Sequence, residues 1–175
     1  MHYYCMYCQS QKCAAVVSDL QAMGIGRAFA PRIIQRKWVK GKALEEIHDY
    51  LPGYVFLYTE EPLTDFGPLW ALPPVLRLLG SPDDFYELYG SDRAFARMLF
   101  ETDGTIGILK AVEEGSVVKL DPTLFGDFEG KIIRLDRGRR RAEIEFDFDG
   151  KVQRVWCGVE MISPIAKDEE TEPQA

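Results

Sequence analysis

The sequence lacks the features that mark membrane proteins, secreted proteins and many common enzymes. Its apolar runs are far shorter than the roughly 20 residues that a membrane helix needs. It opens with MHYYC, which has no basic segment and no cleavage site, so we expect no signal peptide and a cytoplasmic location. The chain also has no P-loop, no glycine-rich dinucleotide turn and no G-x-S-x-G motif, and no carboxylate pair has a spacing typical of acid/base catalysis. These absences predict a protein that is not an enzyme.

Histidine and cysteine are scarce. His2 and His48 are isolated, and neither has a neighbour that would make it a general base. Cys5 and Cys8 form a C-x-x-C pair, but a zinc site usually needs a second ligand pair at a suitable spacing. On one strand, alternation would direct Cys5 and Cys8 to opposite faces. We therefore expect buried, reduced cysteines with no metal and no cofactor, while a thiol or metal protein built on Cys5, Cys8 and Cys13 is an alternative.

Net positive charge is absent, since the formal charge is −7. This argues against a protein that binds nucleic acid over its whole surface. The charge is unevenly distributed, because residues 165–175 are acidic whereas basic side chains cluster between residues 131 and 154. A hydrophobic content of 46% with 12% aromatics can build a real core in one large domain or two small ones.

Strand and helix patterns alternate through residues 1–105. Apolar side chains recur at helical spacing over residues 11–23. Gly41 provides a hairpin turn, followed by a polar return path over residues 42–49. The aromatic and β-branched run at 54–59 is typical of a central strand covered on both faces. We expect a sheet with helices packed on it, including further strands over residues 3–8, 27–39 and 75–79 and a second long helix over residues 92–100.

The pattern changes after about residue 113. Short strands follow one another with turn signals between them, and Asp149-Gly150 is a strong two-residue hairpin signal. This favours a small β-barrel over residues 115–164, after a polar linker over residues 106–114. Residues 165–175 are expected to be a frayed acidic tail. The fold class is therefore α+β: an α/β sandwich domain over residues 1–105 and a small barrel.

Both halves contain segments that resemble one family. In the second half, segments 114–120 and 125–136 resemble a KOW motif, which transcription elongation factors share with several ribosomal proteins. In the first half, the order of segments is similar to the N-terminal (NGN) domain of the NusG family. We therefore identify the chain, over residues 3–163, as resembling that family. The matching first-half segments are YYCMYC at 3–8, FAP at 29–31, VKGK at 39–42, LPGYVF at 51–56 and LPPV at 72–75.

Some details resemble specialised members of the family. Tyr7, Cys8 and the 39–42 hairpin are similar to the antiterminators RfaH and LoaP. The turn at 148–151 departs from the general factor, because Asp149 replaces the aromatic residue expected at its tip. This departure argues against coupling to Rho or the ribosome. Residues 83–90 form an insertion to which the resemblance assigns no role.

The resemblance implies a hydrophobic depression that receives the clamp helices of RNA polymerase. Aromatic side chains carry much of the energy in such helix-in-groove contacts. Because side chains alternate along a strand, Tyr54 and Phe56 share one face, and Val55 and Leu57 the other. From the sequence alone these aromatics would be assigned to the core, and it is the resemblance that favours docking. The implied polymerase-binding residues are Tyr7, Tyr54, Phe56, Trp70 and Leu72.

Two basic groups are candidates for nucleic-acid contact, although either could be a solvated surface. The first is expected to bind nascent leader RNA, mainly through the turn at 137–140, because the arginine fork suits phosphate. The second lies on the first-domain hairpin, which the family places near upstream or non-template DNA. The first group is Lys131, Arg134, Arg137, Arg139, Arg140, Arg141, Lys151 and Arg154. The second group is Arg36, Lys37, Lys40 and Lys42.

The resemblance therefore implies a monomeric transcription elongation and antitermination factor with no membrane contact. Its N-terminal domain would bind RNA polymerase and suppress pausing and termination, while its KOW domain contacts RNA or a partner protein. The alternative is a KOW-type RNA-binding or ribosome-associated module without polymerase contact.

Overall fold

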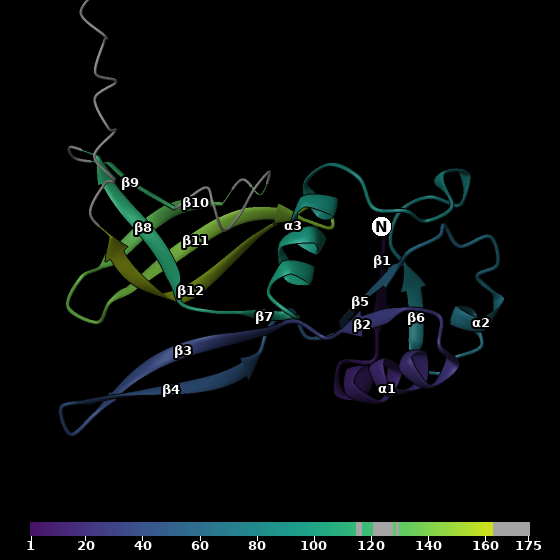
Figure 1. Ribbon diagram of the computed structural model, residues 1–175, viewed down its shortest axis with the longest axis horizontal. Helices are drawn as coiled ribbons and strands as arrows, with labels where there is room; N and C mark the ends of the chain where they lie inside the picture. The colour runs from purple at the N-terminus through teal and green to yellow at the C-terminus, as the bar shows by residue number, and fades with distance from the viewer. Residues whose placement is uncertain (115–116, 121–127, 129, 163–175) are drawn as a thin grey trace, which may run out of the picture.

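The computed structural model describes residues 1–114, 117–120, 128 and 130–162. Figure 1 shows a helix-containing half and a strand-rich half, with α3 between them. The helical elements are η1 (Ser10–Lys12), α1 (Cys13–Met23), α2 (Gly67–Trp70), η2 (Pro82–Asp84) and α3 (Gly90–Glu101). The strands are β1 (His2–Cys8), β2 (Arg27–Phe29), β3 (Arg32–Val39), β4 (Lys42–Asp49), β5 (Tyr54–Thr59), β6 (Val75–Leu78), β7 (Thr105–Ile106), β8 (Leu109–Glu114), β9 (Val117–Leu120), β10 (Lys131–Asp136), β11 (Arg141–Phe148) and β12 (Lys151–Ile162).

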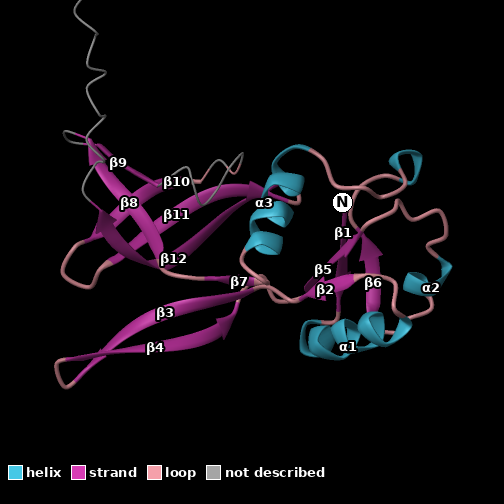
Figure 2. Cartoon of the chain, viewed as in Figure 1, coloured by secondary structure: helices cyan, strands magenta, loops and turns pink. Residues whose placement is uncertain are grey.

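The first half is a sheet of order β2-β5-β1-β6 (Figure 2). Every residue of β5 is buried, as expected of a central strand. One face of β5 presents Val55 and Leu57 to the apolar stripe of α1, and the other presents Tyr54, Phe56 and Tyr58 toward α3. The predicted division of faces is therefore confirmed.

The second half is a sheet of order β10-β11-β12-β8-β9. Its outer strands β9 and β10 also approach each other, so the sheet curls toward a barrel. The β11–β12 hairpin turns at Asp149 (φ 51°) and Gly150 (φ 67°), the two left-handed residues of a type I′ turn. The Asp-Gly hairpin prediction is confirmed.

Two segments have more regular structure than expected. Part of the expected linker, 106–114, forms β8, which pairs in parallel with β12 and buries Leu109 and Ala111. The polar segment 42–49 forms β4, whose residues are all exposed, because backbone pairing with β3 suffices for a hairpin strand. The expected tail, 165–175, lies outside the described residues. No helix in the described part of the chain is long and apolar enough to span a membrane.

Candidate functional site

The aromatic face of β5 is extended by the neighbouring strand. Tyr7 of β1 lies opposite Tyr54 in the antiparallel register, and their ring centroids are 5.1 Å apart. Gly53 precedes Tyr54 with φ 98°, and a Cβ there would lie 2.8 Å from the Tyr7 ring. Only glycine adopts this left-handed φ without strain and also has no Cβ to clash with the Tyr7 ring. Gly53 therefore lets the chain pass close beside Tyr7.

The tip of the β11–β12 hairpin covers this aromatic face. The Phe148 ring lies 5.2 Å from Tyr54 and 5.5 Å from Phe56, centroid to centroid. Phe146 stacks on Phe95 of α3 at 4.9 Å. Phe56 and Phe148 have no exposed surface, and Tyr54 is 8% exposed. The two halves of the molecule therefore share one continuous aromatic core.

A polar cluster closes around the hairpin turn, and we call it the Asp149 latch (Asp149, Tyr54, Arg77 and Asp92). The Tyr54 hydroxyl donates to Asp149 Oδ2 at 2.8 Å. Arg77 donates to both carboxylate oxygens of Asp149, at 2.6 and 3.2 Å. The Asp149 backbone N–H donates to Asp92 Oδ1 at 2.9 Å. A forked arginine–carboxylate pair fixes orientation as well as distance, so the latch specifies how the hairpin sits.

The latch carboxylates have opposite pKa shifts. Burial acts to raise the pKa of Asp149, but the hydrogen bonds from Arg77 and Tyr54 outweigh it and hold the pKa below its ordinary value. Burial raises the pKa of Asp92, and the nearby charge of Asp149 adds to the rise. Burial and the bond to Asp149 raise the pKa of Tyr54, which therefore remains a donor. The docked arrangement therefore favours the ionised form of Asp149 and disfavours the ionised form of Asp92.

The cysteines Cys5 and Cys8 lie on opposite faces of the NGN sheet. Cys5 packs with the Tyr54 face and Cys8 with the α1 face, so this pair cannot hold one metal ion. Burial raises the pKa of Cys8 and of Cys157 to about 12, which keeps both as neutral thiols.

Comparison with known proteins identifies the family. The family profile described as "Transcription termination factor nusG" matches residues 1–98, more than half of the chain. The chain belongs to the NusG family. A NusG-family protein is a transcription elongation or termination factor, and the family is non-enzymatic and binds RNA polymerase.

A solved structure supports the fold of both halves. The structure titled "Domain interaction in Thermotoga maritima NusG" matches with a TM-score of 0.51 at 20% identity, and the match covers 90% of this chain and 93% of that one. No curated protein sequence matches the chain. Together with the profile match, the likeness assigns the first half to an NGN-type domain and the second to a KOW-like β domain.

The structure separates the five residues expected to bind polymerase. Tyr7, Tyr54 and Phe56 lie together beneath the KOW hairpin. Leu72 packs on the opposite face of the NGN sheet, in the cluster that contains Val55. Trp70 is 46% exposed. Trp70 and Leu72 therefore do not extend the aromatic face.

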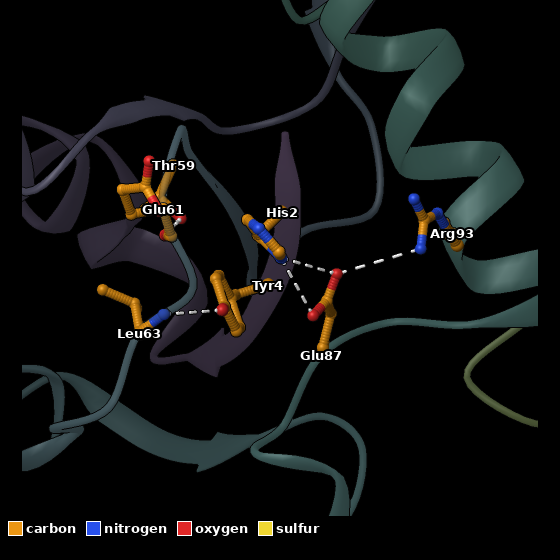
Figure 3. Close-up of polar contacts among 7 residues, drawn as sticks. All are labelled: His2, Tyr4, Thr59, Glu61, Leu63, Glu87 and Arg93. Atoms are coloured by element: carbon orange, nitrogen blue, oxygen red, sulfur yellow. Dashed lines mark hydrogen bonds and ion pairs between the residues drawn. The ribbon is translucent and has the colours of Figure 1, made fainter.

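The 83–90 insertion is fastened to the edge of the NGN domain (Figure 3). Glu87 lies 3.1 Å from His2 Nδ1 and 3.8 Å from an Arg93 nitrogen. The Leu88 backbone N–H donates to the Tyr3 carbonyl, and the Leu88 side chain is buried. In the same view the Tyr4 hydroxyl accepts from the Leu63 backbone N–H at 2.9 Å. The insertion is thus an integral part of the NGN packing.

Many of the basic side chains expected to bind RNA are paired with carboxylates. Arg154 lies 2.8 Å from Glu145, and Arg134 lies 3.8 Å from Glu143. Arg141 pairs with Asp136 and also lies 4.6 Å from the centroid of the Trp156 ring. Lys131, Lys151 and the turn residues Arg137, Arg139 and Arg140 are exposed. The turn thus remains the most concentrated basic feature, as the sequence predicts.

Part of the positive charge on the first-domain hairpin is also offset by ion pairs. Arg36 pairs with Glu45 at 3.3 Å and Lys37 with Glu46 at 3.9 Å. Lys40 and Lys42 are exposed at the tip. β3 packs beside β12 of the KOW-like domain, and Figure 1 shows the hairpin extending along that domain.

Sequence reasoning missed the residues that close the site. The hairpin aromatics Phe146 and Phe148 alternate with polar residues, which also describes an ordinary barrel strand. Arg77 and Asp92 carry no motif. The one available signal was Asp149, which replaces the expected tip aromatic and proves to be the centre of the latch.

Proposed function

We propose that this protein is a transcription elongation and antitermination factor whose polymerase-binding face is covered by its own KOW hairpin. Tyr7, Tyr54 and Phe56 would receive the clamp helices of RNA polymerase once the hairpin leaves. The bound NGN domain would bridge the polymerase cleft, disfavour clamp opening and suppress pausing and termination. The observation that carries the proposal is the burial of Tyr54 and Phe56 by Phe148.

Docking of the hairpin and binding of polymerase would compete for one surface. A partner helix cannot reach Phe56 while Phe148 lies against it. Apparent polymerase affinity is then the intrinsic affinity reduced by the fraction of undocked molecules. Release would free the KOW-like domain to contact RNA or a partner protein from a tethered position.

The test measures binding of purified core RNA polymerase to the full chain and to variants. Asp149→Ala removes the ion pair with Arg77 and the bond from Tyr54, so we expect it to bind polymerase at least about 10-fold more tightly. Asp147→Ala is the matched control, since Asp147 lies on the same strand but is exposed.

Adding Tyr54→Ala to Asp149→Ala tests the face itself. With the latch already open, loss of an interface tyrosine should weaken polymerase binding by about 5- to 150-fold. Equal binding by Asp149→Ala and the double variant, both folded, would refute the site. Equal binding by the wild type and Asp149→Ala would refute the covering role of the hairpin.

Transcription in vitro provides the functional readout. On a template with a pause site and an intrinsic terminator, Asp149→Ala should increase read-through at lower protein concentration than the wild type. Increased termination would instead favour a termination role for this family member.

A further inference from the structure

A cleft lies where the β3–β4 hairpin meets the KOW-like domain, and we call it the arginine cleft. Its volume is about 420 Å³, within the range of small-ligand sites. Arg36 lines it from β3, while Arg137, Arg140, Glu160 and Met161 line it from the other domain. The cleft is therefore composite, because it needs both domains in the docked arrangement.

Arg140 is held in place without a partner for its charge. Its φ is 48°, in the left-handed region that arginine rarely adopts. The Arg140 carbonyl accepts from the Val159 backbone N–H at 2.8 Å, which ties the turn to β12. The Arg140 guanidinium makes no hydrogen bond or ion pair with any residue in the described part of the chain. The left-handed φ belongs to the tight turn between β10 and β11, where the Arg140 backbone N–H donates to the Arg137 carbonyl at 3.3 Å.

Arg36 approaches from the opposite wall. Its side chain is only 18% exposed, and one nitrogen lies 3.3 Å from Glu45. A guanidinium has five N–H donors, so donors remain beyond this bond. Gln35 Nε2 donates to the Trp156 carbonyl at 3.5 Å, which helps to hold β3 against β12. Arg36, Arg137 and Arg140 thus line one cleft, and Glu160 is the single carboxylate among the described residues of its wall.

We propose that the arginine cleft binds the phosphate group of a nucleotide, either free or within RNA. Planar guanidinium forks match phosphate oxygens, and Met161 provides an apolar wall for a base or sugar. Because both domains line the cleft, the ligand binds the docked arrangement better than the undocked one and stabilises it. The inference rests on the docked arrangement and not on polymerase binding.

The test uses the full chain without polymerase and two probes, fluorescent adenosine 5′-monophosphate and a short labelled oligouridylate. Arg140→Gln and Arg36→Gln should each weaken binding by about 10-fold, as expected for one lost charge-assisted hydrogen bond. Lys12→Gln, an exposed lysine of η1, is the matched control and should have no effect. Asp149→Ala should also weaken binding, because it opens the cleft.

Each outcome decides the proposal. Binding of the mononucleotide supports a free nucleotide as ligand, and binding of the oligomer alone supports RNA. Absence of binding by both probes at low salt overturns the proposal. An effect of Arg140→Gln without an effect of Arg36→Gln, in folded proteins, overturns the composite site. Polymerase binding is measured separately, so its failure would leave this result unaffected.

Discussion

Asp149 has two roles in the hairpin turn. It is one of two left-handed residues in the hairpin turn, and its carboxylate is the acceptor for Tyr54 and Arg77. The aromatic residue expected at this position could fill space on a partner but could not accept these bonds. Asp149 therefore suits the tip of the turn to this protein's own NGN domain, where it accepts from Tyr54 and Arg77.

A pair of isosteric variants separates the two latch carboxylates. Asp149→Asn should undock the hairpin because it loses the charge that Arg77 and Tyr54 stabilise. Asp92→Asn should leave docking unchanged or strengthen it, since the amide oxygen can still accept from the Asp149 N–H while the disfavoured charge is gone. Nuclear magnetic resonance (NMR) of the backbone amide at position 149 would report the docked fraction in both. Equal undocking by the two variants would contradict the assigned roles.

The pH dependence of hairpin docking follows from the pKa shifts of Asp149 and Asp92. The depressed pKa of Asp149 means that its contribution is fully present above its undocked pKa of about 4 and is lost as pH falls through the lower docked value. The raised pKa of Asp92 has the opposite sign, so its protonation in mild acid relieves a cost. We expect docking to strengthen slightly as pH falls through the Asp92 pKa and to weaken below about 4. Titration of the Asp149 amide signal checks this, and Asp92→Asn should abolish only the first change.

The β11–β12 hairpin holds the two domains together by its aromatic tip. Phe148→Ala removes a fully buried ring that touches Tyr54, Phe56 and Phe95, and such truncations cost about 3–5 kcal/mol. Much of this loss should appear as undocking rather than unfolding, and it should be seen as faster hydrogen exchange at β5 and α3. Val152→Ala, at a 59% exposed position of the same hairpin, should change neither. Protection unchanged in Phe148→Ala would show that the hairpin does not shield the face.

The turn that connects α3 to β7 depends on Gly104. Gly104 has φ 75°, and a Cβ there would lie 2.7 Å from Phe29 Cβ. Gly104→Ala should therefore destabilise the protein by about 2–4 kcal/mol through left-handed strain and overpacking. Gly107→Ala is the control, because a Cβ at Gly107 meets nothing within 4 Å. Urea unfolding would compare the two, and equal midpoints would contradict the expectation.

The sequence predicts the helices, strands and turns well where side-chain alternation along a strand or a known turn sequence decides them. The division of β5 into a Tyr54 face and a Val55 face follows from alternation, and the Asp-Gly turn follows from backbone sterics. The strand β8 within the expected linker was not predicted, because the alternation of Leu109 and Ala111 is too short to stand out from polar neighbours. The latch could not be predicted, since Arg77 and Asp149 are far apart in sequence and no periodicity relates them.

In the molecule as a whole, the aromatic face of β5 has two uses that exclude each other. The aromatic face of the NGN domain either packs against Phe148 or, in our proposal, binds polymerase. The arginine cleft would add a second control, because its ligand favours the docked arrangement. Polymerase and the cleft ligand should therefore reduce each other's affinity by the same factor, as linkage requires.

Hydrogen exchange of the full chain would test this competition directly. In the free protein the amide of Asp149 is bonded to Asp92 and should exchange slowly. When polymerase is added, the hairpin is expelled, so protection at the β11–β12 turn should fall while β5, now covered by polymerase, stays protected. If polymerase instead left the turn protected, the face of β5 would not be where it binds, because Phe148 cannot remain against Phe56 while a partner helix occupies the same surface.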